Sequence, residues 1–429
     1  MACICFGWTA CSGSDEEPPC EVGEGECPNA CTTGEALEGA VCEGPEDCAC
    51  GFFCKAGTCS FYQGDYRGCL CEGVEMAAPG LPILGLGSHM TDELVIEVLA
   101  DSSDQIATPR DLAFNPDAPD QLWVANSPPD STPLEGGHMV VVHDADTDSP
   151  SSQKFHQGMG GSGHFFPHPS AFAFGLPSEL ASIHETHQQT PRTSGDTPDE
   201  FMGPVLQDTT IGIFNAGHTS HLDMLHDSPL GMGIAWDHDR VYWVFDGFHS
   251  SLTRYDFVEP HSDVPNGLGG EDHSDGDTRR YILQDSIRRE PGVPSHMVVD
   301  HDTDLLYVAD TGNARIAVLD TTTGTIGQEY PGFDMALQRF VSGAELWTLA
   351  DADSVGFELP SGIELHDGYL WVTDNATSRI YALSLDGEVV DWLDTGLPAG
   401  SLMGITFDDE GRMYLVDAVG DEVLRITAH

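Results

Sequence analysis

The sequence predicts an all-β fold, a six-bladed β-propeller preceded by a small disulfide-rich module. A pattern of short strands recurs six times between Thr108 and His429. A lone strand-like segment, residues 93–100, stands before the first copy of this pattern. All 13 cysteines of the 429-residue chain lie at or before Cys71. The repeat predicts the propeller, the lone strand predicts how it closes, and the cysteines mark where it begins.

The repeat consists of an apolar strand, an acidic hairpin, a second strand rich in aromatic and β-branched residues, and a third strand. The clear copies are "SHMVVDHDTDLLYVADTGNARIAVLD" from Ser295, "SGIELHDGYLWVTDNATSRIYALS" from Ser361, "MGITFDDEGRMYLVDAVGDEVLRIT" from Met403 and "MGIAWDHDRVYWVFDGFHSSLTRYDF" from Met232. Weaker copies are "RDLAFNPDAPDQLWVANSPP" and "SAFAFGLPSELASIHETH". We expect the second strands to close at Asn126, Glu185, Asp246, Asp310, Asp374 and Asp417. Such units are typical of propeller blades.

The last copy ends after three strands, at the end of the chain. A four-stranded blade needs one more strand, and "ELVIEVLA", residues 93–100, lies before the first copy with no partner of its own. We therefore expect residues 93–100 to pair with the strand containing "VLRITA" and to close the ring.

The chain before the propeller divides into a signal-like segment with an acidic linker (1–19), a cysteine-rich module (20–72) and a linker (73–92). The start, "MACICFGWTACSGSDEEPP", resembles the end of a bacterial lipoprotein signal with Cys11 as the lipidated residue, although a basic segment is missing. Ten cysteines lie between Cys20 and Cys71. They favour a disulfide scaffold over a zinc knuckle, and hence an oxidising location, extracellular or at the cell surface.

The formal net charge is −55, from 71 acidic and 16 basic side chains. Such a field repels nucleic acid and anionic membranes. We expect no nucleic-acid partner, and contact with a membrane only through a lipid on Cys11. The partners left open are a small molecule, a peptide or a surface ligand.

The segments "LYVADTGNARI" and "LWVTDNATSRI" resemble the NHL repeat, and the resemblance extends over residues 93–429. Among proteins of this type, the chain is distantly similar to the peptidyl-hydroxyglycine amidating lyases. That resemblance implies a metal-assisted lyase with zinc held by histidines at the channel mouth and calcium as a structural ion. The lyase pattern places histidines after proline at the start of inner strands, whereas this chain has Ser295 in "VPSHM" and Ser361 in "LPSGI". The three-histidine pattern is thus not reproduced.

The stretch "HTSHLDMLHDSPLGMGIAW" carries three histidines immediately before a predicted inner strand. We expect it to form the loop that enters the third blade, on the face that also holds the turns between second and third strands. Convergence of imidazoles there predicts a transition-metal site, with zinc or copper in preference to iron or haem. The predicted ligands are His218, His221, His226, His249 and His296. The alternative is a loop whose histidines only hydrogen-bond acidic neighbours.

Two acidic loops offer carboxylates to calcium. They are "DADTDS" from Asp144 and "EDHSDGD" from Glu271, and neither has the closing glutamate of an EF-hand. On the opposite face, His238, His301 and His366 lie in acidic hairpins that we interpret as solvated turns.

The chain contains no GxSxG, phosphate-binding loop, HExxH or dinucleotide fingerprint. Two functions remain after the sequence analysis. One is an extracellular metal-binding propeller, acting as a metal-dependent lyase or redox enzyme at the channel mouth. The other is a non-catalytic binding or adhesion propeller with only structural calcium.

Overall fold

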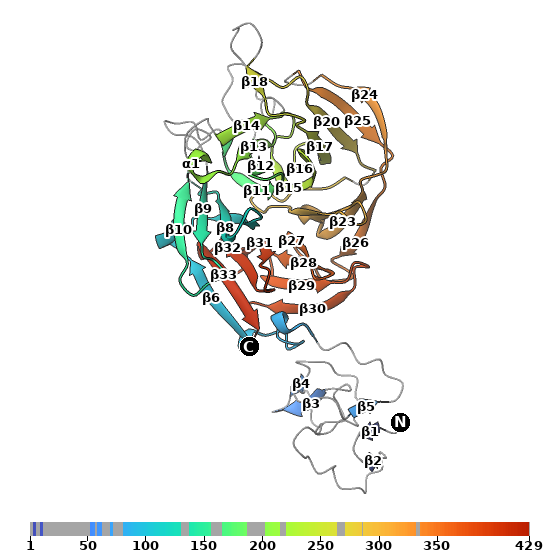
Figure 1. Cartoon of the computed structure of the whole chain (residues 1–429). Helices are drawn as coiled ribbons and strands as arrows, with labels where there is room; N and C mark the ends of the chain where they lie inside the picture. Colours follow the sequence, from blue (N-terminus) through green and yellow to red (C-terminus); the bar gives the residue numbers. More distant parts are fainter. Residues whose placement is uncertain are drawn as a thin grey trace. The chain divides into compact units, whose positions relative to one another are not determined.

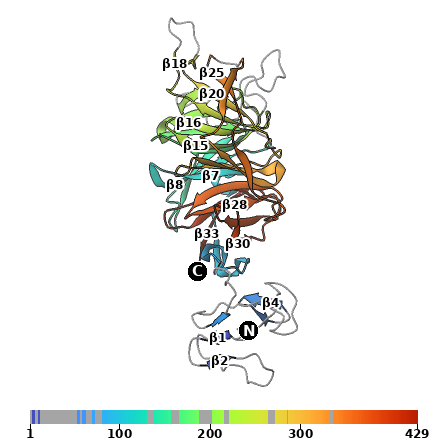
Figure 2. The same cartoon turned by 90° about the vertical axis from the view of Figure 1, so that its right-hand side faces the viewer.

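The computed structural model describes residues 3–5, 9–11, 52–55, 58–61, 69–71, 80–129, 137–155, 165–186, 202–214, 220–263, 271–284, 286–331 and 335–428. Residues 94–428 form an all-β propeller in which six sheets surround a central axis (Figure 1). Figure 2 shows the same sheets from the side. The predicted all-β, six-bladed fold is confirmed.

Each blade contains four antiparallel strands, and we call them the inner, second, third and fourth strands in order from the axis outward. The inner strands are β7 (Pro109–Asn115), β11 (Pro169–Phe174), β15 (Gly231–His238), β21 (Met297–Asp300), β27 (Pro360–His366) and β31 (Leu402–Phe407). The second strands are β8 (Ala118–Asn126), β12 (Glu179–His184), β16 (Val241–Asp246), β22 (Leu305–Asp310), β28 (Tyr369–Asp374) and β32 (Met413–Asp417). The third strands are β9 (His138–His143), β13 (Val205–Asp208), β17 (Ser251–Asp256), β23 (Arg315–Asp320), β29 (Arg379–Leu383) and β33 (Glu422–Ala428). The fourth strands are β10 (Ser151–Phe155), β14 (His221–Met224), β20 (Asp277–Ile282), β26 (Leu346–Asp351), β30 (Val389–Asp394) and β6 (Leu94–Ala100).

The ring closes as the sequence predicts. β6 pairs antiparallel with β33, from Leu94 opposite Ala428 to Ala100 opposite Val423, and Figure 1 shows the two strands side by side. An ion pair stabilises this pairing of β6 with β33, since the guanidinium of Arg425 in β33 lies 2.9 Å from the carboxylate of Glu97 in β6. The same guanidinium donates to the carbonyl of Thr147 in the β9–β10 hairpin, so that it also ties the last blade to the first.

The core consists of apolar layers between neighbouring blades. One layer joins the last and first blades and includes Tyr414, Val416, Leu122 and Val140, all fully buried. Comparable layers fill the spaces between blades 1 and 2, 2 and 3, 3 and 4, and 4 and 5. The sheets of the first four blades are therefore covered on both faces, which explains why their strands are nearly continuous runs of apolar residues.

Acidic or amide residues close the second strands in five blades, as expected. Asp374 is typical: its carboxylate accepts the backbone N–H of Leu359 and of Thr377 and thereby holds two loops together. The expectation of Glu185 in the second blade is wrong by one residue. His184 ends β12 and faces Pro169, just as Asn126 faces Pro109. Burial lowers the pKa of His184 to about 3, so a neutral imidazole occupies this position.

The third and fourth blades share strands, which the repeat does not predict. A hairpin of β24 (Thr325–Glu329) and β25 (Leu337–Ser342) leaves the fourth blade between β23 and β26. β25 pairs in parallel with β20, so the sheet of the third blade has six strands. Asp277 of β20 binds Arg339 of β25 at 2.7 Å, which fixes the hairpin in this register.

The remaining described elements are short. Within the propeller, the short elements are the strand pair β18 (Ser262–Asp263) and β19 (Glu271–Asp272), the helix α1 (Ile211–Phe214), and the 3-10 turns η4 (Ser102–Asp104) and η7 (Thr311–Asn313). Before it come η2 (Pro82–Leu84) and η3 (Thr91–Glu93). No helix in the described ranges has the length and apolar character that a bilayer crossing requires.

Residues Met1–Glu93 form a separate unit, of which short strands are described. β1 (Cys3–Cys5) pairs with β2 (Thr9–Cys11) and β5 (Cys69–Cys71), and β3 (Phe52–Lys55) pairs with β4 (Thr58–Phe61). Cys54 lies opposite Cys59 in this pairing. Most of the cysteine-rich module falls outside the described residues, so its disulfides stay a prediction.

The closure predicts a sharp difference between two truncations. A chain that lacks residues 1–90 retains β6 and should melt as the propeller of the full-length protein does. A chain that lacks residues 1–102 loses β6 and exposes the edge of β33, so it should melt at least several degrees lower or aggregate. Calorimetry on both chains tests this, and equal melting temperatures would contradict the role of β6.

Candidate functional site

The inner strands present their residues to the central channel in layers. Backbone pairing with the second strands places Asp111 opposite Ala125 and Gly233 opposite Phe245, each one residue before the end of the second strand. The equivalent positions of the six blades form a first layer. They are Asp111, Ala171, Gly233, His296, Gly362 and Gly404.

The glycines of this layer permit neighbouring inner strands to approach closely. A Cβ on Gly233 would overlap the backbone carbonyl of Ser295, and one on Gly362 would overlap that of Met403. A Cβ on Gly404 would lie 3.0 Å from the Cα of Asp111. Four of the six positions thus carry glycine or alanine, and the two larger side chains occupy the centre of the channel.

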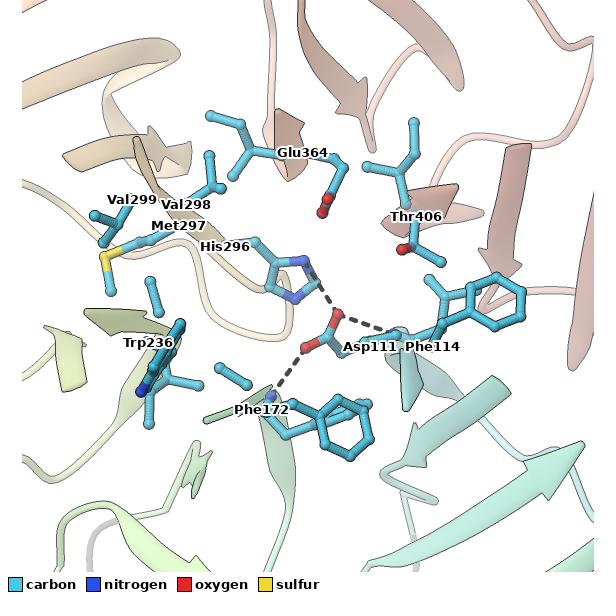
Figure 3. A pocket seen from close by; sticks show the side chains of 18 of the residues that line it. Asp111, Phe114, Phe172, Trp236, His296, Met297, Val298, Val299, Glu364 and Thr406 are labelled. Carbon is cyan, nitrogen blue, oxygen red and sulfur yellow. Dashed lines mark hydrogen bonds and ion pairs between the residues drawn. The ribbon is translucent and has the colours of Figure 1, made fainter. Parts of the chain in front are cut away.

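Those two side chains, Asp111 and His296, come from opposite blades of the ring and meet at the axis (Figure 3). His296 Nδ1 lies 3.7 Å from Asp111 Oδ1. The other imidazole nitrogen, Nε2, donates to the carbonyl of Ser170 at 3.3 Å, since a carbonyl only accepts. Asp111 Oδ2 accepts the backbone N–H of Phe172 at 2.9 Å, and Oδ1 accepts that of Leu112 at 2.9 Å. The pair therefore links the first, second and fourth blades.

A second layer lies two residues further along each inner strand. It contains Ala113, Ala173, Ala235, Val298, Glu364 and Thr406, all of which line one cavity of about 410 Å³. Only Glu364 and Thr406 are polar, and Figure 3 shows the carboxyl of Glu364 and the hydroxyl of Thr406 directed toward the centre of the cavity, near Asp111 and His296. Most of the other lining side chains are apolar, and several of these are aromatic. They include Phe114, Phe172, Phe174, Trp236, Met297 and Phe407.

The carboxyl of Glu364 is strongly perturbed by the cavity. Burial in the channel raises its pKa from 4.5 to about 8, and the negative charge of Asp111 adds to this shift. Its side chain keeps some accessible surface because the cavity itself admits solvent. Burial also raises the pKa of Asp111 above its ordinary range, although His296 and the N–H groups of Phe172 and Leu112 act in the opposite direction. At neutral pH the cavity therefore holds a protonated Glu364.

The cavity extends toward the face that carries the hairpins between first and second strands. Its lining runs from Asp111 and His296, near the start of their strands, to Pro116, Trp236 and His301 beyond or near the ends of theirs. His301, interpreted from the sequence as part of a solvated turn, is exposed in a turn and also lines the cavity, 5.3 Å from Trp236 between ring centroids. The cavity lies on the side opposite the one predicted for the functional site.

The structure places the predicted metal ligands in several locations. His218 lies outside the described residues. His221 is not in a loop that enters the third blade: it begins β14, the outermost strand of the second blade, and His226 follows that strand. His249 lies in the turn between β16 and β17, where its Nδ1 is 2.8 Å from Asp246. Among the four predicted ligands that the structure describes, His296 alone lines the cavity.

This distribution separates His221 from His296. An outermost strand lies three strand spacings, about 14 Å, from the inner strand of its own blade. One metal ion, about 2.0–2.1 Å from each ligand nitrogen, cannot bind both residues. His296 thus lies at the channel and His221 at the outer edge of the ring, and metal binding by the predicted ligands stays a prediction.

The two acidic loops predicted to bind calcium differ in their surroundings. In the second loop, Asp277 is already paired with Arg279 and Arg339 at 2.7 Å each. In the first, Asp148 lies 3.8 Å from Arg425. Calcium binding at these loops stays a prediction.

Sequence reasoning missed Asp111, Glu364 and Thr406. Their signal is nevertheless present in the sequence, because aligned inner strands read "RDLAF", "SAFAF", "MGIAW", "SHMVV", "SGIEL" and "MGITF". At the second and fourth letters most copies carry glycine, alanine or valine, and a polar side chain at such a position must face the channel.

No family model matches the chain, and no curated protein matches it. Among solved structures, an auxiliary nutrient binding protein from Bacteroides thetaiotaomicron VPI-5482 is 11% identical with a TM-score of 0.46, over 74% of this chain and 68% of that one. A streptogramin B lyase is 10% identical with a TM-score of 0.45, over 78% and 98% of the two chains. A luciferin-regenerating enzyme is 11% identical with a TM-score of 0.43, over 78% and 95%. Likenesses this distant carry no information on ligand or reaction, and the resemblance to NHL repeats and amidating lyases stays a prediction.

The raised pKa of Glu364 predicts a pH-dependent difference between the protein and its Glu364→Gln variant. Between pH 4.5 and 8 the folded protein retains a proton that the unfolded chain releases, so Glu364 lowers the free energy of unfolding as pH rises through this range. Glutamine cannot ionise, so from pH 5 to pH 9 the variant should gain on the order of 1–3 kcal/mol relative to the parent. Urea unfolding at pH 5, 7 and 9 measures this difference. Glu329→Gln, in the exposed β24, is the control and should show no such gain. A constant difference between parent and Glu364→Gln at all three pH values would contradict the assignment.

Proposed function

We propose that this propeller binds a small, largely apolar molecule in its channel cavity and exchanges a proton with it through Glu364. The observation that carries the proposal is a carboxyl group whose pKa is about 8, lining a cavity with many apolar side chains beside a second carboxyl in a different environment. Strongly perturbed carboxyls in cavities are characteristic of acid–base sites.

The two carboxyls are suited to different roles. Glu364 makes no hydrogen bond to another described residue and is directed into the cavity, so its proton is available to a ligand. Asp111 accepts two backbone N–H groups and faces His296, and these contacts oppose the rise in its pKa that burial causes. In this assignment Glu364 is the general acid, and the Asp111–His296 pair provides a fixed charge distribution beneath the ligand.

The cavity suits a ligand with an aromatic or aliphatic body and one polar group. Its volume of about 410 Å³ lies within the range of roughly 300–1,000 Å³ typical of small-molecule sites. Phe114, Trp236 and Phe407 would contact the apolar body, while Glu364 and Thr406 would hydrogen-bond the polar group. Transfer of a proton to that group is chemistry that a lyase or a hydrolase needs.

A non-catalytic binding propeller is the second candidate, because the same cavity can hold a ligand without changing it. The Glu364→Gln variant separates the two. A ligand that the parent protein converts and the variant only binds supports the enzyme, whereas a ligand that both bind unchanged supports the binding protein.

We also propose that the protein acts outside the cytoplasm, with residues 20–72 as a disulfide module and Cys11 as a lipid attachment site. Support comes from the ten cysteines between Cys20 and Cys71 and from the absence of cysteine in the propeller sequence. The net charge of −55 suits a setting in which salt screens self-repulsion.

If the cavity binds a small, largely apolar molecule, the protein should also bind a neutral apolar probe. N-phenyl-1-naphthylamine should become fluorescent with the parent protein and should compete with the natural ligand. Ala113→Phe places a ring in the cavity and should weaken probe binding at least tenfold, because Ala113 lines the cavity and is only half-buried. Ala376→Phe, in the turn after β28, is the matched control and should bind as the parent does. Equal binding by all three proteins would place the probe elsewhere and count against the cavity as the site.

The disulfide module predicts that native protein isolated under non-reducing conditions has no reactive thiol among the ten cysteines from Cys20 to Cys71. Reduction should lead to new reactive thiols without changing the melting temperature of the propeller, whose sequence contains no cysteine. Thiol titration before and after reduction, combined with calorimetry, tests both parts. Several reactive thiols in the native protein would argue for a reduced module and against an oxidising location.

A further inference from the structure

The channel cavity offers a ligand few hydrogen-bond donors. Side chains with nitrogen or oxygen atoms line it at six positions, which are Asp111, Trp236, His296, His301, Glu364 and Thr406. The indole N–H of Trp236 already donates to the carbonyl of Asp239 at 2.9 Å. His296 Nε2 likewise donates to the carbonyl of Ser170. Among the described residues that line the cavity, none is lysine or arginine, so an anionic ligand would find no fixed positive charge of that kind.

Two carboxyl groups face the same space at the centre of the cavity. Figure 3 shows the carboxyl of Glu364 directed toward that of Asp111. Burial, and after it the negative charge of Asp111, raises the pKa of Glu364 to about 8. Two carboxylates this close repel each other away from bulk water, whereas a cation beside them stabilises the charged form of both. A cationic group is therefore the ligand group that lets both carboxyls ionise.

The rings around the carboxyls suit a cation that has an apolar body. Five aromatic side chains line the cavity, namely Phe114, Phe172, Phe174, Trp236 and Phe407. The face of an aromatic ring attracts an ammonium group within about 6 Å, and the same rings pack against aryl or alkyl groups. The net charge of −55 adds a field that attracts cations and repels anions.

We propose that the ligand of the channel cavity is an organic amine, whose ammonium group lies between Glu364 and Asp111 while its apolar body packs on the aromatic side chains. This inference rests on the proposed function, because it specifies the polar group of the ligand of that cavity. A primary ammonium has three N–H donors. The two carboxylates and the hydroxyl of Thr406, which Figure 3 shows directed toward the same space, are acceptors for all three.

Binding of the amine moves one proton. An alkylammonium has a pKa of about 10, so at pH 7 the nitrogen stays protonated, while Glu364 ionises and releases its proton to solvent. This ionisation lowers the affinity about tenfold at pH 7, because the pKa of Glu364 is about 8. Charge-assisted hydrogen bonds to two carboxylates offset this cost, since they are roughly twice as strong as neutral ones. Asp111, His296 and His301 are the other titratable groups that line the cavity.

The test compares three compounds that share a phenylethyl body and differ in charge: 2-phenylethylamine, 2-phenylethanol and 3-phenylpropionate. Calorimetric titration of the full-length protein at pH 7 should show that the amine binds roughly tenfold more tightly than the alcohol and roughly 100-fold more tightly than the carboxylate. Titration in two buffers of different ionisation enthalpy should show release of nearly one proton with the amine and none with the alcohol.

Glu364→Gln should lose both the preference for the amine and the proton release, because glutamine neither ionises nor carries a charge. It should still bind 2-phenylethanol within about threefold of the parent, which also shows that the cavity is folded. Glu329→Gln, in the exposed β24, removes one surface carboxylate and is the matched control, which should keep both properties. Sodium chloride at about 0.5 M should leave the preference in place, since salt screens mainly exposed charges.

Ala113→Phe separates failure of this inference from failure of the proposed function. If Ala113→Phe abolishes binding of the alcohol but the parent does not prefer the amine, the cavity remains the site and the amine is excluded. A preference for the amine that Glu364→Gln retains, or no binding of the amine by the parent, would also overturn the inference. Amine and alcohol binding that Ala113→Phe leaves unchanged would overturn both the inference and the proposed function.

Discussion

The contact between Asp111 and His296 depends on the near-absence of side chains elsewhere in the same layer of the channel. Glycine or alanine stands at the other four positions, and for Gly233 and Gly362 a Cβ would overlap the backbone of the next inner strand. The small residues at these four positions therefore both allow the inner strands to approach closely and leave room for a polar pair at the axis. The pair in turn places Asp111 beneath Glu364, and burial, together with the charge of Asp111, raises the pKa of Glu364 to about 8. The chemistry proposed for the cavity thus follows from packing constraints at the centre of the ring.

Much of the fold could be predicted because a blade is a local structure. Strand, hairpin and closing residue follow one another within about 25 residues, so each copy is readable by itself, and the lone segment 93–100 had only one place to pair. The error at Glu185 has a similar origin. Nothing local distinguishes it from His184, and only the pairing of β12 with β11 decides which residue ends the strand.

The site could be predicted only in part, because its residues meet through the closed ring rather than along the chain. His296 stood out by replacing the glycine of other copies, but its partner Asp111 lies 185 residues earlier, in one of the weaker copies. The segment around His221 misled for a different reason. The second blade has long insertions, and residues 221–224 of the histidine-rich stretch form its outer strand, which a short apolar strand pattern cannot reveal.

Because of the β24–β25 hairpin, the third blade is not a complete unit without the fourth. Propellers can gain or lose blades by duplication or deletion when each blade completes itself, apart from the closing seam. Here the fourth blade provides two strands to the sheet of the third, in parallel with β20, and Val341 of β25 belongs to the apolar cluster that includes Tyr281 and Trp243. Loss of the fourth blade would therefore leave its neighbour with an uncovered edge and a defective core. The third and fourth blades therefore depend on each other for their stability, and removing either one should destabilise the other.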